Sequence, residues 1–301
     1  MSSNPLTQIP DLPGSLLILL LNNLTVTQLP IFNTSGLSAL DLSFSSFQVD
    51  DRFFNLLSNS KNLSALNLGG LSIQNFTFLD SMISLKELSL ASTGLVEIPL
   101  QIYSLSNLEK LELERNAIRG VPQQLENLTK LESINLNNNL ISDVAPNLTF
   151  LKNLALKNNS LSFSSLVNLC SPNLQSLDIS HNNISSLPLG WGSSFRNLSF
   201  LDLSFNSIYS LKNVSILLYQ ILITLNLDNN MLREIPEEIG ESVYLRNLYF
   251  SNNFVSLANK FPSNLVVLRA YNNSLKNTSA INFLLSSRTV RLFLRLFLFP
   301  I

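Results

Sequence analysis

Residues Leu108 to Pro122 read LEKLELERNAIRGVP, and their apolar spacing recurs in almost every other segment of the chain. Leu111 and Leu113 alternate with charged residues, which is the pattern of a short strand that is buried on one face. Asn116 and Ile118 follow at the point where the chain turns away from that strand. The stretch therefore predicts one strand and one turn of a larger repeating unit.

The apolar spacing of this stretch recurs along the chain with a period of roughly 20 to 26 residues. About twelve segments share the register Leu-x-x-Leu-x-Leu. They begin at Leu16, Leu37, Leu63, Leu85, Leu108, Leu131, Leu151, Leu174, Leu198, Leu222, Leu245 and Leu265. Because each strand returns to the same point after a connection of similar length, the strands are expected to lie in parallel and to build a solenoid.

The connections between strands are expected to form the outer, convex side of the solenoid. Asp50 to Leu57 (DDRFFNLL) places acidic residues before apolar residues at helical spacing, which predicts a short capped helix. Residues 98–105 and 121–128 each predict a single helical or tighter turn. The predicted fold class is an α/β solenoid, a horseshoe with a parallel concave sheet and short helical or irregular convex turns.

A column of asparagines occupies the position where each strand ends. A buried amide without a partner costs roughly 1–3 kcal/mol, so this column predicts a continuous ladder of side-chain hydrogen bonds to adjacent repeats. Its members are Asn116, Asn139, Asn159, Asn182, Asn206, Asn230, Asn253 and Asn273. In earlier repeats Ser45 and Thr93 are expected to act as shorter donors, whereas Leu24 and Leu71 predict looser geometry or a more apolar spine.

The two ends of the chain depart from the repeat. Residues 1–280 are predicted to be the solenoid, which starts mid-repeat because Asn4 to Pro10 match only the second half of a repeat. Residues 281–301 form an apolar tail with interspersed arginines outside the repeat register, since the register would bury Arg295. An edge strand, a membrane-surface segment and a non-native extension are the alternatives for this tail.

Composition excludes several classes of protein. The 301 residues are 46% hydrophobic and 13% charged with a net charge of −1, so we expect a large core and no general attraction to nucleic acid. Cys170 is the only cysteine, which excludes an internal disulfide and a closed zinc centre, and no cofactor is expected. Ser15 to Leu21 is too short to span a bilayer, so membrane attachment is expected only through a missing or C-terminal segment.

No stretch of the sequence carries a phosphate-binding glycine loop, a zinc-protease helix or a dinucleotide fingerprint. His181 is the sole histidine and is expected to be a surface-turn residue, since no acid is placed to orient it. Trp191 is expected to cover the core rather than to contact a ligand. The sequence therefore predicts no catalytic residues and no enzyme activity.

With the pattern LxxLxLxxNxLxxIP, the chain resembles the leucine-rich repeat family from Asn4 to about Leu275. The resemblance implies a scaffold that binds a protein or peptide on its concave sheet, as the recognition portion of a receptor-like signalling protein. The Ile-Pro and Val-Pro endings resemble both receptor-like ectodomains and intracellular adaptor-type repeats, while the Gly-x-Ile-Pro signature of plant receptors is missing. An intracellular adaptor and a fragment of a larger receptor-like kinase are therefore the alternatives.

Twelve glycosylation sequons and a low charge favour an extracellular or membrane-attached glycoprotein over a cytoplasmic protein. The absence of a signal peptide and of cysteine caps points the other way. The sequons are at Asn23, Asn33, Asn62, Asn75, Asn127, Asn147, Asn158, Asn183, Asn197, Asn213, Asn272 and Asn277.

Residues that alternate with the core leucines are expected to point from the sheet into solvent and to form the binding face. Two groups are candidate ligand-binding residues. The first is a mixed-charge patch made by Lys110, Glu112, Glu114 and Arg115, and the second is an aromatic group with a cation made by Phe200, Phe205, Tyr249, Arg269 and Tyr271. Exposed aromatic residues and arginines are typical anchors of interfaces, and the alternative is a merely solvated strand face.

Overall fold

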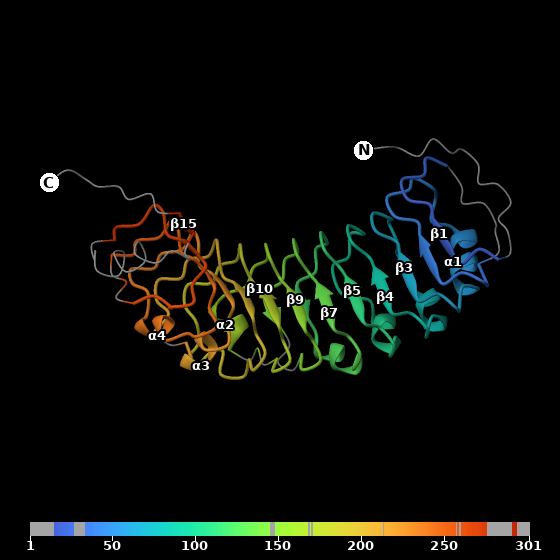
Figure 1. Ribbon diagram of the computed structural model, residues 1–301. Helices are drawn as coiled ribbons and strands as arrows, with labels where there is room; N and C mark the ends of the chain where they lie inside the picture. Colours follow the sequence, from blue (N-terminus) through green and yellow to red (C-terminus); the bar gives the residue numbers. More distant parts are fainter. Residues whose placement is uncertain are drawn as a thin grey trace. The chain divides into compact units, whose positions relative to one another are not determined.

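A computed structural model describes residues 15–26, 34–144, 148–167, 169, 171–212, 214–256, 258, 260–275 and 291–293, the last as backbone alone. The chain divides into two compact units, Met1–Leu140 and Ile141–Ile301. Figure 1 draws the ribbon in colours that follow the sequence, from blue for the first strands to orange and red for the last ones. The two units are called unit 1 and unit 2.

Unit 1 is a stack of parallel strands. Its sheet consists of β1 (Ile18–Leu20), β2 (Ala39–Asp41), β3 (Ala65–Asn67), β4 (Glu87–Ser89), β5 (Lys110–Glu112) and β7 (Ser133–Asn135). Neighbours in the sequence are neighbours in the sheet, and the central residue of each strand pairs with that of the next. The two-residue strand β6 (Gly120–Val121) lies outside this sheet.

Unit 2 repeats the same arrangement. Its sheet consists of β9 (Asn153–Ala155), β10 (Ser176–Asp178), β11 (Phe200–Asp202), β12 (Thr224–Asn226), β13 (Asn247–Tyr249), β14 (Val267–Arg269) and β15 (Arg291–Phe293). All of its pairings are parallel, and the short β8 (Asp143–Val144) lies outside the sheet. Each of the twelve predicted segments supplies one strand, which confirms the parallel solenoid.

The tail contributes one further strand at the edge of unit 2. β15 pairs with β14 so that Leu292 is opposite Leu268, as an edge strand would be. The rest of the tail, the half repeat from Asn4 to Pro10 and Cys170 lie outside the described residues. The predicted division at residue 280 stays a prediction.

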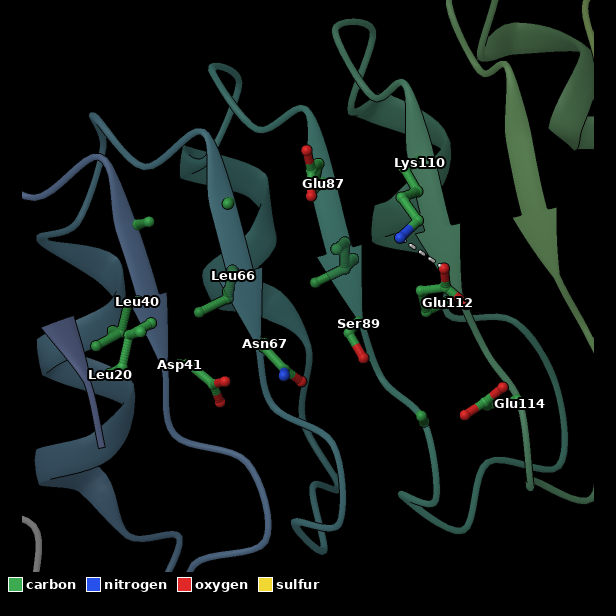
Figure 2. Close-up of a pocket in the computed structure, with 14 residues that line it drawn as sticks. Leu20, Leu40, Asp41, Leu66, Asn67, Glu87, Ser89, Lys110, Glu112 and Glu114 are labelled. Atoms are coloured by element: carbon green, nitrogen blue, oxygen red, sulfur yellow. Dashed lines mark ion pairs between the residues drawn. The ribbon is translucent and has the colours of Figure 1, made fainter. Parts of the chain in front are cut away.

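Short helices occupy the outer connections, behind the strands in Figure 2. The longest is α1 (Asp51–Ser58), where the side chain of Asp50 accepts hydrogen bonds from the amides of Arg52 and Phe53 and caps the helix as predicted. The 3₁₀ turns η2 (Leu100–Ser104) and η3 (Gln123–Asn127) confirm the two predicted tight turns. The remaining ones are η1 (Thr77–Ser81), α2 (Phe163–Leu166), α3 (Ile216–Tyr219) and α4 (Glu237–Gly240).

The asparagine column forms the predicted ladder. Asn206 is typical: its Oδ1 accepts from the amide of Ile184 at 3.1 Å, and its Nδ2 donates to the carbonyls of Ile179 and Leu203 at 3.0 Å each. Ser45 replaces asparagine by accepting from the amide of Leu24 and donating to the carbonyl of Leu21. Leu24 and Leu71 are buried at the positions where an apolar spine was predicted. The ladder therefore satisfies backbone groups that have no partner in the strands.

The residue before each ladder position adopts a left-handed backbone. Phe44, Arg115, His181 and Phe205 have φ of 53–57°, and glycine takes this place only at Gly70. The carbonyl of the adjacent repeat accepts the amide of each of these residues, for example Ser204 for His181. Repeat geometry therefore imposes a conformation that non-glycine residues rarely adopt.

A second ladder, which the sequence analysis missed, marks the entry to the strands. In five repeats an asparagine stands directly before the first core leucine. Its Nδ2 donates to a backbone carbonyl of the preceding repeat. The asparagines are Asn62, Asn107, Asn173, Asn197 and Asn264, with distances of 2.7–3.2 Å. The recurring dipeptide Asn-Leu was the available signal. Hydrogen bonds from asparagine side chains to the backbone of adjacent repeats therefore occur at both ends of the strands.

Trp191 packs in the interior as predicted. Its side chain is 5% exposed and contacts the edge of the Phe195 ring, with 5.3 Å between ring centroids.

Candidate functional site

The solvent-facing side of each sheet presents two rows of side chains. The central residue of every three-residue strand from β1 to β14 is buried, whereas the first and third residues are partly or fully exposed. The third residues form a row that we call the exit row. The alternation predicted from the sequence is therefore present in both units.

Half of the exit row has a structural role. In Asp41, Asn67, Asn135, Asp178, Asp202 and Asn226, a side-chain oxygen accepts the backbone amide two residues ahead at 2.8–3.1 Å. Such a bond holds the side chain against its own turn. The other exit-row residues are Leu20, Ser89, Glu112, Ala155, Tyr249 and Arg269. Three of the predicted binding residues are among them, and their side chains do not form this bond to the turn. These are Glu112, Tyr249 and Arg269.

The predicted mixed-charge patch lies on β5 and the turn that follows it. Lys110 Nζ is 3.0 Å from Glu112 Oε1, and this hydrogen bond and the charge of Glu112 raise the pKa of Lys110. Glu114 Oε2 accepts from the Nδ2 of Asn135 at 2.6 Å. Arg115 is exposed at the left-handed position. All four residues are accessible, and an exposed ion pair such as this one adds little to stability.

A groove runs across the unit 1 sheet, and Lys110, Glu112 and Glu114 of this patch form part of its lining (Figure 2). It has a volume of about 490 Å³ and is lined from Leu20 on β1 to Glu114 after β5. Ala39 and Ala65, the small first residues of β2 and β3, leave this space open. Glu87, on β4, is exposed in the groove and was missed as a site residue. Applying the strand alternation to the first row as well as the exit row would have found it.

The second predicted group is centred on β13 and β14. Tyr249 and Arg269 are opposite each other, and the guanidinium lies 5.0 Å from the centre of the tyrosine ring. Arg269 Nη1 is also 3.8 Å from Asp228 Oδ2. Burial raises the pKa of Asp228, while the amide of Ser251 and the charge of Arg269 act to lower it. Tyr271 is half-buried two residues beyond Arg269.

The phenylalanines do not join this group. Phe200 is the first residue of β11, three strands from β14 and outside the exit row, so it lies roughly 14 Å or more from Arg269 at about 4.8 Å per strand. Phe205 stacks on His181, with 4.1 Å between ring centroids and 11° between the planes. The prediction that Phe200 belongs to one aromatic group with Arg269 is therefore wrong. The aromatic residues occupy three separate places on unit 2.

His181 belongs to a packing contact. Partial burial, together with the charge of Lys157, lowers the pKa of its imidazole, so the ring that stacks on Phe205 is favoured in its neutral form. Within the described ranges, no group of three or more metal-ligating side chains is found.

Comparisons with known proteins agree with this geometry. A family model described as leucine rich repeat matches residues 83–141, and one described as leucine rich repeats (2 copies) matches residues 172–213. The chain is similar to a leucine-rich repeat protein of Leptospira interrogans, with 25% identity and a TM-score of 0.70. The match covers 81% of this chain and 63% of that one. No curated protein sequence is significantly similar to the chain.

Two solved complexes are also similar. One is the ectodomain of the plant membrane receptor kinase GASSHO1/SCHENGEN3 from Arabidopsis thaliana with CASPARIAN STRIP INTEGRITY FACTOR 2, at 26% identity and a TM-score of 0.62 over 85% of this chain and 34% of that one. The other is a TLR13–ssRNA13 complex, at 23% identity and a TM-score of 0.63 over 79% of this chain and 40% of that one. The chain therefore spans less than two thirds of each of these three relatives.

Proposed function

This chain is a leucine-rich repeat protein, and from that premise we propose that it is a non-enzymatic scaffold that binds a protein or peptide on the exposed face of its sheet. The observation that carries the proposal is the interruption of the exit row. Where an aspartate or asparagine would be held against its own turn, Glu112, Tyr249 and Arg269 instead project charge and aromatic surface. Tyrosine and arginine side chains supply much of the free energy of protein interfaces, and an exposed carboxylate adds charge complementarity.

A peptide or protein fits this face better than a nucleic acid does. The groove on unit 1 contains the carboxylates of Asp41, Glu87, Glu112 and Glu114 against the single ammonium group of Lys110. A phosphate backbone requires the opposite charge. The similar Arabidopsis ectodomain was solved with a partner named as an integrity factor, whereas TLR13 was solved with RNA. We propose that the acidic face excludes nucleic acid here.

The partner itself is expected to be found by proximity labelling or pull-down, and its affinity then tests the proposal. Tyr249→Ala should weaken binding by about 2 kcal/mol, because the substitution removes the ring on which Arg269 rests. Gln124→Ala, an exposed substitution on the outer turn η3, is the control and should leave the affinity near wild type. Both variants are first checked for folding by circular dichroism. If Gln124→Ala is the more damaging, the outer side is the recognition surface.

We further propose that the protein is the recognition portion of a receptor-like signalling glycoprotein that reaches the extracellular side. The position of the sequons supports this. The eight sequon asparagines among the described residues all lie off the strands. Glycans on Asn62, Asn75, Asn127, Asn183 and Asn197 would leave the strands themselves uncovered, whereas Asn23, Asn158 and Asn272 occupy the left-handed position that follows a strand. In the described part of the chain, the helices are all too short to cross a bilayer.

The pattern of glycosylation tests the hypothesis that the protein reaches the extracellular side. On expression through a secretory pathway, the protein should carry several glycans, with Asn127 more fully occupied than Asn197. Asn127 is exposed at the end of η3, while the Nδ2 of Asn197 donates to the carbonyl of Pro172. Mass spectrometry before and after glycosidase treatment measures occupancy at each site. Efficient secretion without any glycan would remove the support for this reading and favour the intracellular adaptor.

A further inference from the structure

We propose that the groove on unit 1 binds a peptide segment that presents an apolar residue and one or two lysine or arginine residues. The inference deepens the proposed function, on which it rests, by assigning a ligand class to one place on the sheet. It starts from a groove in which one end is apolar and the other acidic.

The apolar end is formed by Leu20, whose side chain is 64% exposed. Leu20 occupies an exit-row position, where the neighbouring strands have Asp41 and Asn67. Leu17 and Ile18 are exposed beside it in the sequence, at 61% and 57%. An exposed cluster of large apolar side chains on a folded protein commonly marks a binding surface.

The middle of the groove is lined by small side chains and by side chains that bond their own turns. Ala39 and Ala65 contribute only methyl groups, and the side chains of Asp41 and Asn67 bond the amides of Ser43 and Gly69. Since these side chains are held against their own turns, they leave room for an extended chain to lie across the strands.

The acidic end is formed by Glu87, Glu112 and Glu114, which Figure 2 shows on β4, β5 and the turn after β5. Lys110 is paired with Glu112, and it lies opposite Glu87, whose charge also acts on it although no ion pair joins the two among the described residues. The whole chain has 19 basic and 20 acidic residues, so its overall composition does not account for four carboxylates against one ammonium group in this groove. A cationic side chain is the complementary partner, since charge complementarity selects partners and speeds their association.

The separation of the two ends sets the spacing of the ligand. Leu20 is on β1, Glu87 on β4 and Glu112 on β5, three and four strand steps apart. At about 4.8 Å per step these distances are roughly 14 and 19 Å, which an extended peptide spans in about four to six residues at about 3.3 Å each. The expected ligand therefore carries lysine or arginine four to six residues from an apolar residue.

Selection from a displayed library of random heptapeptides on the immobilised full chain tests the inference. The wild type should enrich peptides with this spacing, and a Glu87→Lys/Glu112→Lys variant should not. Glu97→Lys is the matched control, because Glu97 is exposed on an outer connection of the same unit, and it should enrich the same peptides as the wild type. Enrichment of no peptide, of neutral or acidic peptides, or of the same basic peptides by the double variant would overturn the inference.

The most enriched peptide is then synthesised with a fluorophore and titrated by anisotropy. We expect its affinity to fall about tenfold on Glu87→Lys and about fivefold on Leu20→Ser, and to be weaker at about 300 mM than at about 50 mM salt because the charges are accessible to screening. An unchanged affinity in both variants would refute the assignment. If only this inference fails, Tyr249→Ala still weakens the captured partner; if the proposed function fails, that effect is absent too.

Discussion

Replacing Leu136 with alanine is expected to lower the free energy of unfolding by about 2–5 kcal/mol. Leu136 follows β7 directly and is fully buried among the leucines of its repeat. The substitution removes apolar contacts and leaves a cavity that neighbouring repeats fill only in part, because their backbones are fixed by the asparagine ladder. Urea denaturation followed by circular dichroism measures the loss.

The control for this prediction is the adjacent residue. Asn137 is only half-buried, and Asn137→Ala is expected to cost less than about 1 kcal/mol, as most surface substitutions do. Equal losses in the two variants would mean that the inside and the outside of this repeat have been assigned the wrong way round.

The second large effect is expected in the ladder, where Asn182→Ala should cost about 2–3 kcal/mol. Asn182 Oδ1 accepts from the amide of Leu161 at 2.9 Å, and its Nδ2 donates to the carbonyls of Leu156 and Ile179 at 3.0 and 3.1 Å. Alanine removes the oxygen that accepts the backbone N–H of Leu161, so this buried N–H loses its hydrogen-bond partner. A buried amide in that state carries its full desolvation cost.

Asn183 is a matched control from the same repeat. It has the same side chain but is exposed at the position after the ladder, so Asn183→Ala is expected to change stability by no more than about 0.5 kcal/mol. Both variants lose an asparagine side chain, but only Asn182→Ala loses ladder hydrogen bonds. The difference between their free energies of unfolding therefore measures the contribution of those bonds. A cost at Asn183 equal to that at Asn182 would contradict the ladder as a source of stability.

The repeats could be predicted from sequence because every repeat buries leucine at the same positions and pairs the same backbone groups. The central leucine of every strand and the ladder asparagine recur at fixed spacing, so one segment such as Leu108 to Pro122 identifies all the others. The first ladder was visible for that reason. The ladder at the strand entry was missed, although Asn62 and Asn197 each precede a core leucine, because not every repeat has asparagine there.

The candidate site could be predicted only in part. Alternation along a strand tells which side chains face solvent, and Lys110, Glu112, Tyr249 and Arg269 do lie at partly or fully exposed positions, as predicted. Contacts between side chains depend on the row and on how many strands separate them, which is why Phe200 proved distant from Arg269. The groove depends on alanines in two repeats and glutamates in two others, a combination that no single motif records.

Carboxyl footprinting of the full chain, with and without its captured partner, shows whether the sheet face is the recognition surface. Labelling of carboxylates on the sheet face, such as Glu87, Glu112 and Asp202, reports on one surface. Labelling of Asp51 and Glu238 on the outer helices α1 and α4 reports on the other. We expect the partner to lower labelling on the sheet face and to leave the outer carboxylates unchanged. Protection confined to Asp51 and Glu238 would show that the outer side binds the partner instead.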